Sequence, residues 1–121
     1  MKVEIKRETW AVAQTPSDNA LANRDGTFCC LGFLGLACGI PREEMLDKSY
    51  PSQLLNKGDH RFPRAVLRNL GDGRSVQAVL AEINDRKDFS NEEREDWIAA
   101  GFRFALGIEV EFTGSYPETS P

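Results

Sequence analysis

The chain has 121 residues and a mass of 13.5 kDa, which is the usual size of one domain. Apolar residues make up 40% and charged residues 28%, enough apolar material for a hydrophobic core. The net charge of −4 argues against general nucleic-acid binding, because that needs an excess of cations. The longest apolar run, eleven residues, is too short to span a bilayer, and the N-terminus has no signal-peptide core. We therefore expect a cytoplasmic protein with no membrane partner.

Alternating side chains predict one short strand near each end of the chain. Val3 and Ile5 alternate with charged residues, and Ile108 to Phe112 show the same period of two. A lone strand leaves backbone groups unpaired, so pairing the two strands in one small sheet would satisfy both. A dimer that shares a sheet through these strands is also compatible with the sequence.

Between these strands, four to five short helices are expected around a buried central one, which makes the fold α+β and predominantly helical. The central helix is Phe28 to Cys38, apolar on all sides and followed by Gly39 as a C-terminal cap. Residues 15–27 and 49–62 are rich in polar and turn-forming residues and are expected to be loops. The other helices are expected at residues 7–14, 41–47, 63–70, 75–84 and from 90 to about 106.

The last two helices carry the clearest signals. An apolar stripe in residues 75–84 recurs at helical spacing, and Ser90 with Glu93 forms a capping-box pattern. We expect one globular domain over residues 1–112 and a flexible tail over 113–121, where prolines and serines gather. The aromatic residues expected in the core are Trp10, Phe28, Trp97 and Phe102.

Charge is segregated along the second half of the chain. Lys57 to Arg74 has an excess of three positive charges, which with loop amides could hold a phosphate or another anionic small molecule. The predicted ligand-binding residues are His60, Arg61, Arg64, Arg68 and Arg74. Gly71 and Gly73 beside Arg74 only loosely resemble a phosphate-binding turn.

Glu82 to Asp96 has the opposite bias, an excess of four negative charges. An acidic face of this kind can bind a basic site on another protein. The predicted partner face consists of Glu92, Glu93, Glu95 and Asp96. The simpler alternative for both segments is a pair of solvated faces that attract each other.

Three cysteines, Cys29, Cys30 and Cys38, fit a reduced compartment and small apolar positions in a core. We expect no metal, because no C-x-x-C pair exists and a helix would hold Cys30 and Cys38 about 12 Å apart. No cofactor is expected either. The catalytic alternative makes Cys29 or Cys30 a nucleophile at a helix start, with His60 as base. Asn84 or Asp85 would then orient the base, although termination of a helix is the simpler role for that pair.

The segment Phe28-Cys29-Cys30-Leu31-Gly32 resembles a recurrent group of small uncharacterised proteins from tailed phages and prophages. That group also carries an N-terminal Trp and a Leu-x-x-x-Asn-Asp element, which Trp10 and residues 80–85 match. The resemblance implies a phage accessory gene that acts in the cytoplasm of the host cell, and no mechanism.

These observations together predict a binding module and not an enzyme. We expect an antagonist of a bacterial anti-phage defence system, which binds a host defence protein or sequesters an anionic small-molecule signal. The alternatives are a cysteine-dependent hydrolase or transferase, and a small structural or assembly protein of the phage. A homo-oligomer is compatible with each of them.

Overall fold

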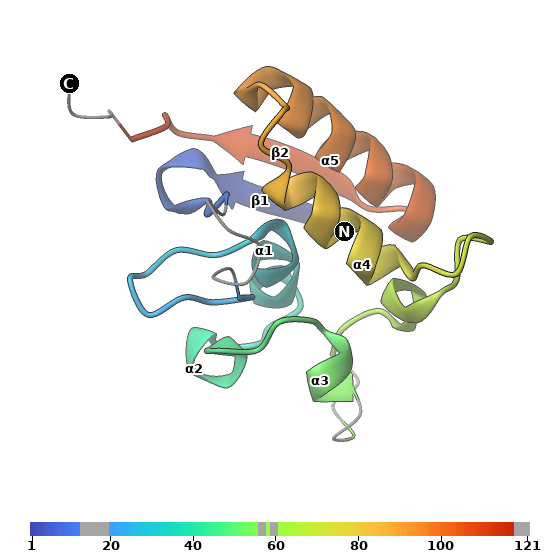
Figure 1. Cartoon of the computed structure of the whole chain (residues 1–121). Helices are drawn as coiled ribbons and strands as arrows, with labels where there is room; N and C mark the ends of the chain where they lie inside the picture. Colours follow the sequence, from blue (N-terminus) through green and yellow to red (C-terminus); the bar gives the residue numbers. More distant parts are fainter. Residues whose placement is uncertain (13–19, 56–57, 59–60, 118–121) are drawn as a thin grey trace.

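The computed structural model describes residues 1–12, 20–55, 58 and 61–117. Within them the fold is α+β, as predicted, with a two-stranded sheet built from the two ends of the chain and helices between them (Figure 1). The strands are β1 (Lys2–Lys6) and β2 (Glu109–Thr113). The helices are α1 (Cys30–Ala37), α2 (Arg42–Met45), α3 (Ser52–Leu55), α4 (Val76–Asp85) and α5 (Asn91–Leu106), with 3-10 turns η1 (Arg7–Thr9) and η3 (Arg64–Leu67).

The predicted pairing of the terminal strands is confirmed. β1 and β2 run parallel, with Val3 opposite Val110 and Ile5 opposite Phe112. Val3 and Ile5 are fully buried, so one face of β1 belongs to the core, as the alternation predicts. Parallel strands need a long crossover connection, and here all the helices lie within that connection.

The buried central helix is also confirmed, but α1 begins two residues later than predicted. Phe28 is held in extended backbone, because its amide donates to the Thr9 carbonyl at 2.9 Å and its carbonyl accepts from the Ala11 amide at 2.8 Å. Every residue from Cys30 to Gly35 is buried. Gly39 follows the helix with φ +86°, the left-handed conformation that a C-terminal cap needs.

Helices α4 and α5 form a hairpin on one side of the molecule (Figure 1). Ser75 caps α4 by accepting from the Ala78 amide. The predicted capping box starts α5: the Glu93 amide donates to the Ser90 hydroxyl, and the Ser90 amide donates to the Glu93 carboxylate, both at 3.1 Å. Both helix predictions are therefore confirmed, to within one residue at their starts.

Three of the other predicted elements need correction. Over residues 7–12, the described part of the helix expected at 7–14, the chain forms the 3-10 turn η1 and then bonds to Phe28 in extended form. Residues 13 and 14 lie outside the described residues. The helix expected at 63–70 is likewise the single turn η3. The loop expected at 49–62 contains α3, whose Leu54 and Leu55 are buried in the core.

The predicted tail begins inside the fold. Thr113 is the last residue of β2, one position beyond the domain boundary expected at 112. The ring of Tyr116 stacks on Trp10, with the two centroids 6.3 Å apart. Residues 118–121 of the predicted tail lie outside the described residues. The domain thus includes contacts made by residues 113–116.

Candidate functional site

The basic residues predicted to hold an anion make contacts on separate elements. Arg61 donates to Glu44 on α2 at 2.8 Å, and Arg68 donates to the carbonyl of Ala105 near the end of α5 at 2.8 Å. Arg64 is exposed on η3, and His60 lies outside the described residues. The contacts of Arg61 and Arg68 therefore do not converge on a common cradle.

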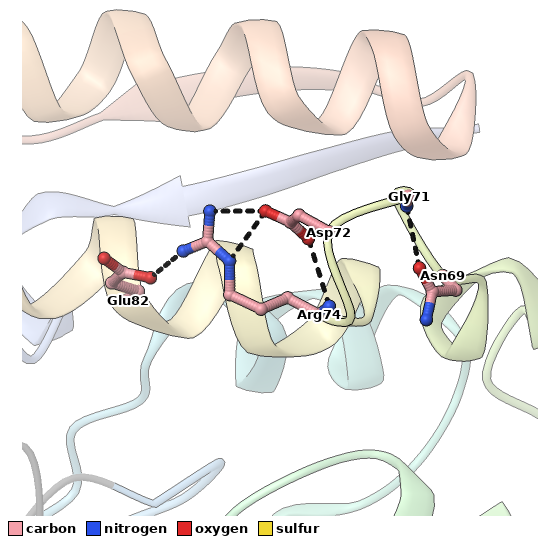
Figure 2. Close-up of polar contacts among 5 residues, drawn as sticks. All are labelled: Asn69, Gly71, Asp72, Arg74 and Glu82. Carbon is pink, nitrogen blue, oxygen red and sulfur yellow. Dashed lines mark hydrogen bonds and ion pairs between the residues drawn. The ribbon is translucent and has the colours of Figure 1, made fainter.

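Arg74, the last of these residues, is held between two carboxylates, as Figure 2 shows. Its guanidinium donates to Asp72 at 2.9 and 3.0 Å and to Glu82 on α4 at 2.5 Å. The Asp72 carboxylate also accepts from the Arg74 amide, and the Asn69 side chain accepts from the Gly71 amide. In the glycine turn that loosely resembled a phosphate-binding turn, these two backbone amides are therefore already bonded to side chains of the same turn. The contact with Glu82 joins the basic segment to the acidic one.

The four acidic residues of the predicted partner face have different environments. Glu92 and Asp96 are exposed, and Glu93 is exposed while it completes the capping box. Glu95 instead faces the core side of α5, with its side chain only 17% exposed. It binds both Nε and Nη2 of Arg7, at 2.9 and 2.8 Å. Glu95 is therefore engaged within the fold, whereas the other three carboxylates stay on the surface.

The pKa values of Glu95 and of its neighbour Tyr116 are both shifted by this placement. The ion pair with Arg7 lowers the pKa of the Glu95 carboxyl below its usual value. The hydroxyl of Tyr116 donates to the same carboxylate at 2.5 Å. Burial, with the Glu95 charge adding to it, raises the pKa of Tyr116 well above its ordinary value. The cluster ties η1, α5 and the segment after β2 together.

The thiols do not have the environment of a nucleophile. Cys29 and Cys30 are buried, and burial raises the pKa of the Cys29 thiol to about 11. Burial also raises the pKa of Cys30 well above the usual thiol value. Both groups are therefore protonated near neutral pH, and the positions suit the predicted apolar role better than the catalytic alternative.

Asn84 is the polar residue whose role the sequence reasoning missed. It is fully buried at the end of α4, and its carbonyl oxygen accepts from the Trp10 indole at 2.6 Å and from the Cys30 amide at 3.0 Å. Its amide group donates to the Ala11 carbonyl and to Asp85, each at 2.9 Å. Asn84 thus joins α4, the start of α1 and the segment after η1, which is more than the termination of one helix.

An apolar surface remains on the outer side of the α4–α5 hairpin. Its most exposed side chains are Phe104 (87%), Trp97 (55%) and Leu70 (45%). Phe104 and Leu70 border a shallow hollow of about 190 Å³, whose wall includes Val76 and Val79 of α4. Ile83 and Trp97 border a neighbouring hollow, and Val79 lines both hollows. We call Leu70, Val79, Ile83, Trp97, Gly101 and Phe104 the aromatic face.

The prediction of Trp97 as a core residue is wrong. Its ring stacks on Phe89 with centroids 6.1 Å apart and an interplanar angle of 9°. The Arg86 guanidinium lies over the Phe89 ring, 4.4 Å from its centroid. Ile98 and Phe102 fill the core side of α5, which turns Trp97 outward. Trp97 and Phe104 are therefore both presented on the surface by one rigid helix.

Among the described residues, no helix combines the length and the apolar character that crossing a membrane requires. In the same part of the chain, no three His, Cys, Asp or Glu side chains are grouped so that they could bind a metal ion. The chain matches no protein-family model, no curated protein and no solved structure.

Proposed function

We propose that this protein is a binding module that docks on another protein through the aromatic face. One observation carries the proposal: Phe104, 87% exposed, stands beside a hollow that Leu70 and Val79 also line. A large exposed apolar side chain beside an apolar hollow is typical of protein interaction sites. Trp is also among the residue types that contribute most binding energy in such sites.

A protein partner fits the surface better than a small anion does. Arg61, Arg68 and Arg74 contact three different elements, and two of them are already paired with carboxylates. An anion would have to displace those carboxylates before the guanidinium groups could turn toward it. The aromatic face needs no such rearrangement, because its side chains already stand on α4, on α5 and, for Leu70, on the segment before α4.

The proposed partner is a bacterial anti-phage defence protein, which the module antagonises. Support for this context comes from the resemblance of Phe28-Cys29-Cys30-Leu31-Gly32 to the small phage and prophage proteins. Support for the mode of action comes from the aromatic face, which acts by contact and requires no catalytic group. The exposed carboxylates of Glu93 and Asp96 lie one turn before Trp97 and next to it, and they would contact a basic rim on the partner, while Glu92 is exposed on another side of α5.

The test expresses the protein in bacterial strains that each carry one defined defence system and then challenges them with phage. We expect the efficiency of plating to rise in at least one strain. The double variant Trp97→Ala/Phe104→Ala should lose this effect and should also lose binding to the purified defence protein in calorimetry. Tyr50→Ala removes another exposed aromatic ring away from the face and should behave like the wild type. Equal activity of the double variant, or no effect in any strain, would contradict the proposal.

A further inference from the structure

The outer side of α5 is close to symmetric about its middle. Trp97 and Phe104 are separated by seven residues, two helical turns or about 10 Å, and therefore share one side of the helix. Ala100, which is small and exposed, lies between them. Two bulky groups thus flank a stretch where another helix can approach closely.

The charges beside these two aromatic residues have opposite signs. Asp96 precedes Trp97, and Glu93 lies one turn before Trp97; both carboxylates are exposed. Arg103 precedes Phe104 and is also exposed. Arg68 adds a second cation at that end, where it binds the Ala105 carbonyl. The face is therefore acidic at the Trp97 end and basic at the Phe104 end.

We propose that the aromatic face binds a second copy of this chain, with the two α5 helices antiparallel about a twofold axis near Ala100. Rotation about that axis brings Trp97 opposite the partner subunit's Phe104. It also brings Asp96 near the partner subunit's Arg103, and the same two contacts repeat on the other side of the axis. Ala100 then lies where the two helices cross.

The polarity of the charges favours a second copy as the resting occupant of the face. A partner with a uniformly acidic or uniformly basic surface would be attracted at one end of the face and repelled at the other. A second copy in antiparallel orientation matches both ends at once. Arg74 and Arg86 border the hollow beside Trp97, but each is paired with neighbouring carboxylates, so they do not make that end basic.

The size of the face predicts a weak dimer. The helix α5 is about 24 Å long, and two packed helices are about 20 Å wide with side chains. Such a patch would bury roughly 1,000 Å² in total, at the lower limit for a specific interface, so we expect a micromolar dissociation constant. This inference uses the docking surface of the proposed function, and it implies that a defence protein must displace the second copy.

Sedimentation velocity over concentrations from about 1 µM to about 1 mM measures this equilibrium. The wild type should shift from monomer to dimer over that range. Phe104→Ala should raise the dissociation constant at least about tenfold, because it removes an aromatic contact on each side of the axis. Phe104 is largely exposed, so this variant should keep the fold, which circular dichroism checks. Tyr50→Ala is the matched control and should dimerise like the wild type.

Charge reversal tests the antiparallel geometry itself. Asp96→Arg and Arg103→Glu should each weaken the dimer, because each places like charges opposite one another. The double variant Asp96→Arg/Arg103→Glu should restore it, because the exchanged charges again meet opposite signs across the axis. A wild type that stays monomeric at about 1 mM overturns the inference. Single variants that dimerise normally, or a double variant that is not restored, overturn the arrangement.

The two proposals fail separately in these experiments. A monomer that still raises plating efficiency refutes self-association and leaves the proposed function standing. A protein that dimerises but has no effect in any defence strain supports self-association and refutes the proposed function.

Discussion

Arg7 and Glu95 lie 88 positions apart in the chain and form a two-pronged ion pair at 2.8 and 2.9 Å. Arg7 also donates to the Gly114 carbonyl at 2.9 Å, and its guanidinium lies 5.9 Å from the ring centroids of Phe112 and Tyr116. One arginine thus connects the end of β1 to α5 and to the segment after β2. Contacts of Arg7 thus hold the ends of β1 and β2 and the helix α5 together at one end of the parallel sheet.

This geometry makes stability depend on pH in the acid range. Because the Glu95 pKa is lower in the folded chain, the pair stabilises the fold above the unfolded pKa and loses that effect as pH falls through the folded pKa. Glu95→Gln should cost about 1–2 kcal/mol near pH 7, since it leaves Arg7 without its charged partner. Urea unfolding at several pH values should show that the difference from wild type shrinks below pH ~4.

Glu92→Gln provides the control, because Glu92 lies on the same helix but is exposed. It should change the free energy of unfolding by less than about 0.5 kcal/mol. A difference between Glu95→Gln and wild type that stayed constant down to acid pH would show that the carboxylate charge is not what stabilises the cluster.

Asn84→Ala should be among the most destabilising polar substitutions in the described chain. It removes the acceptor for the Trp10 indole and the Cys30 amide and the donor for the Ala11 carbonyl. Leaving buried groups unpaired costs about 1–3 kcal/mol each, so we expect a loss of at least about 3 kcal/mol in urea unfolding. Lys87→Ala, at an exposed position just after α4, should be nearly neutral. A comparably small effect for Asn84→Ala would mean that water replaces its hydrogen bonds.

Gly32→Ala should also destabilise, although alanine normally favours a helix. A Cβ at Gly32 would lie 1.8 Å from the Leu21 carbonyl oxygen, which is backbone and cannot turn away. The cost should exceed about 2 kcal/mol in thermal or urea unfolding. Gly101→Ala is the comparison, because its Cβ would meet only the end of the Leu80 side chain, at 2.8 Å. It should be much less harmful, and equal losses at the two glycines would contradict this explanation.

The sequence predicted the elements that local signals determine. The alternation in β1, the stripe of α4 and the capping box of α5 each depend on neighbouring residues, and each is confirmed. The short helix α3 was missed because its polar surroundings resemble a loop, while Leu54 and Leu55 are buried by distant elements. Hydrophobic contacts across the fold are not visible in a window of ten residues.

The residues of the candidate site were harder to predict, because the rotation of α5 about its axis decides which side chains are exposed. Glu92, Glu93, Glu95 and Asp96 look alike in sequence, yet Glu95 points toward Arg7 while the others stay on the surface. Trp97 was expected in the core because of its size, and the helix rotation that buries Ile98 turns it outward. A helical projection of α5 centred on Ile98 and Phe102 would have shown Trp97 and Phe104 on one outer side.

The three thiols should react in an order set by their burial. Cys38, at the end of α1, is half-buried, whereas Cys29 and Cys30 are buried with strongly raised pKa values. Alkylation of the native protein with iodoacetamide, followed by peptide mass spectrometry, should label Cys38 first and the other two only after unfolding. The Cys38→Ser variant should therefore react negligibly in its native state and twice per chain in urea. Rapid native labelling of Cys29 or Cys30 would mean that the thiol is accessible and activated, and it would restore the cysteine-enzyme alternative.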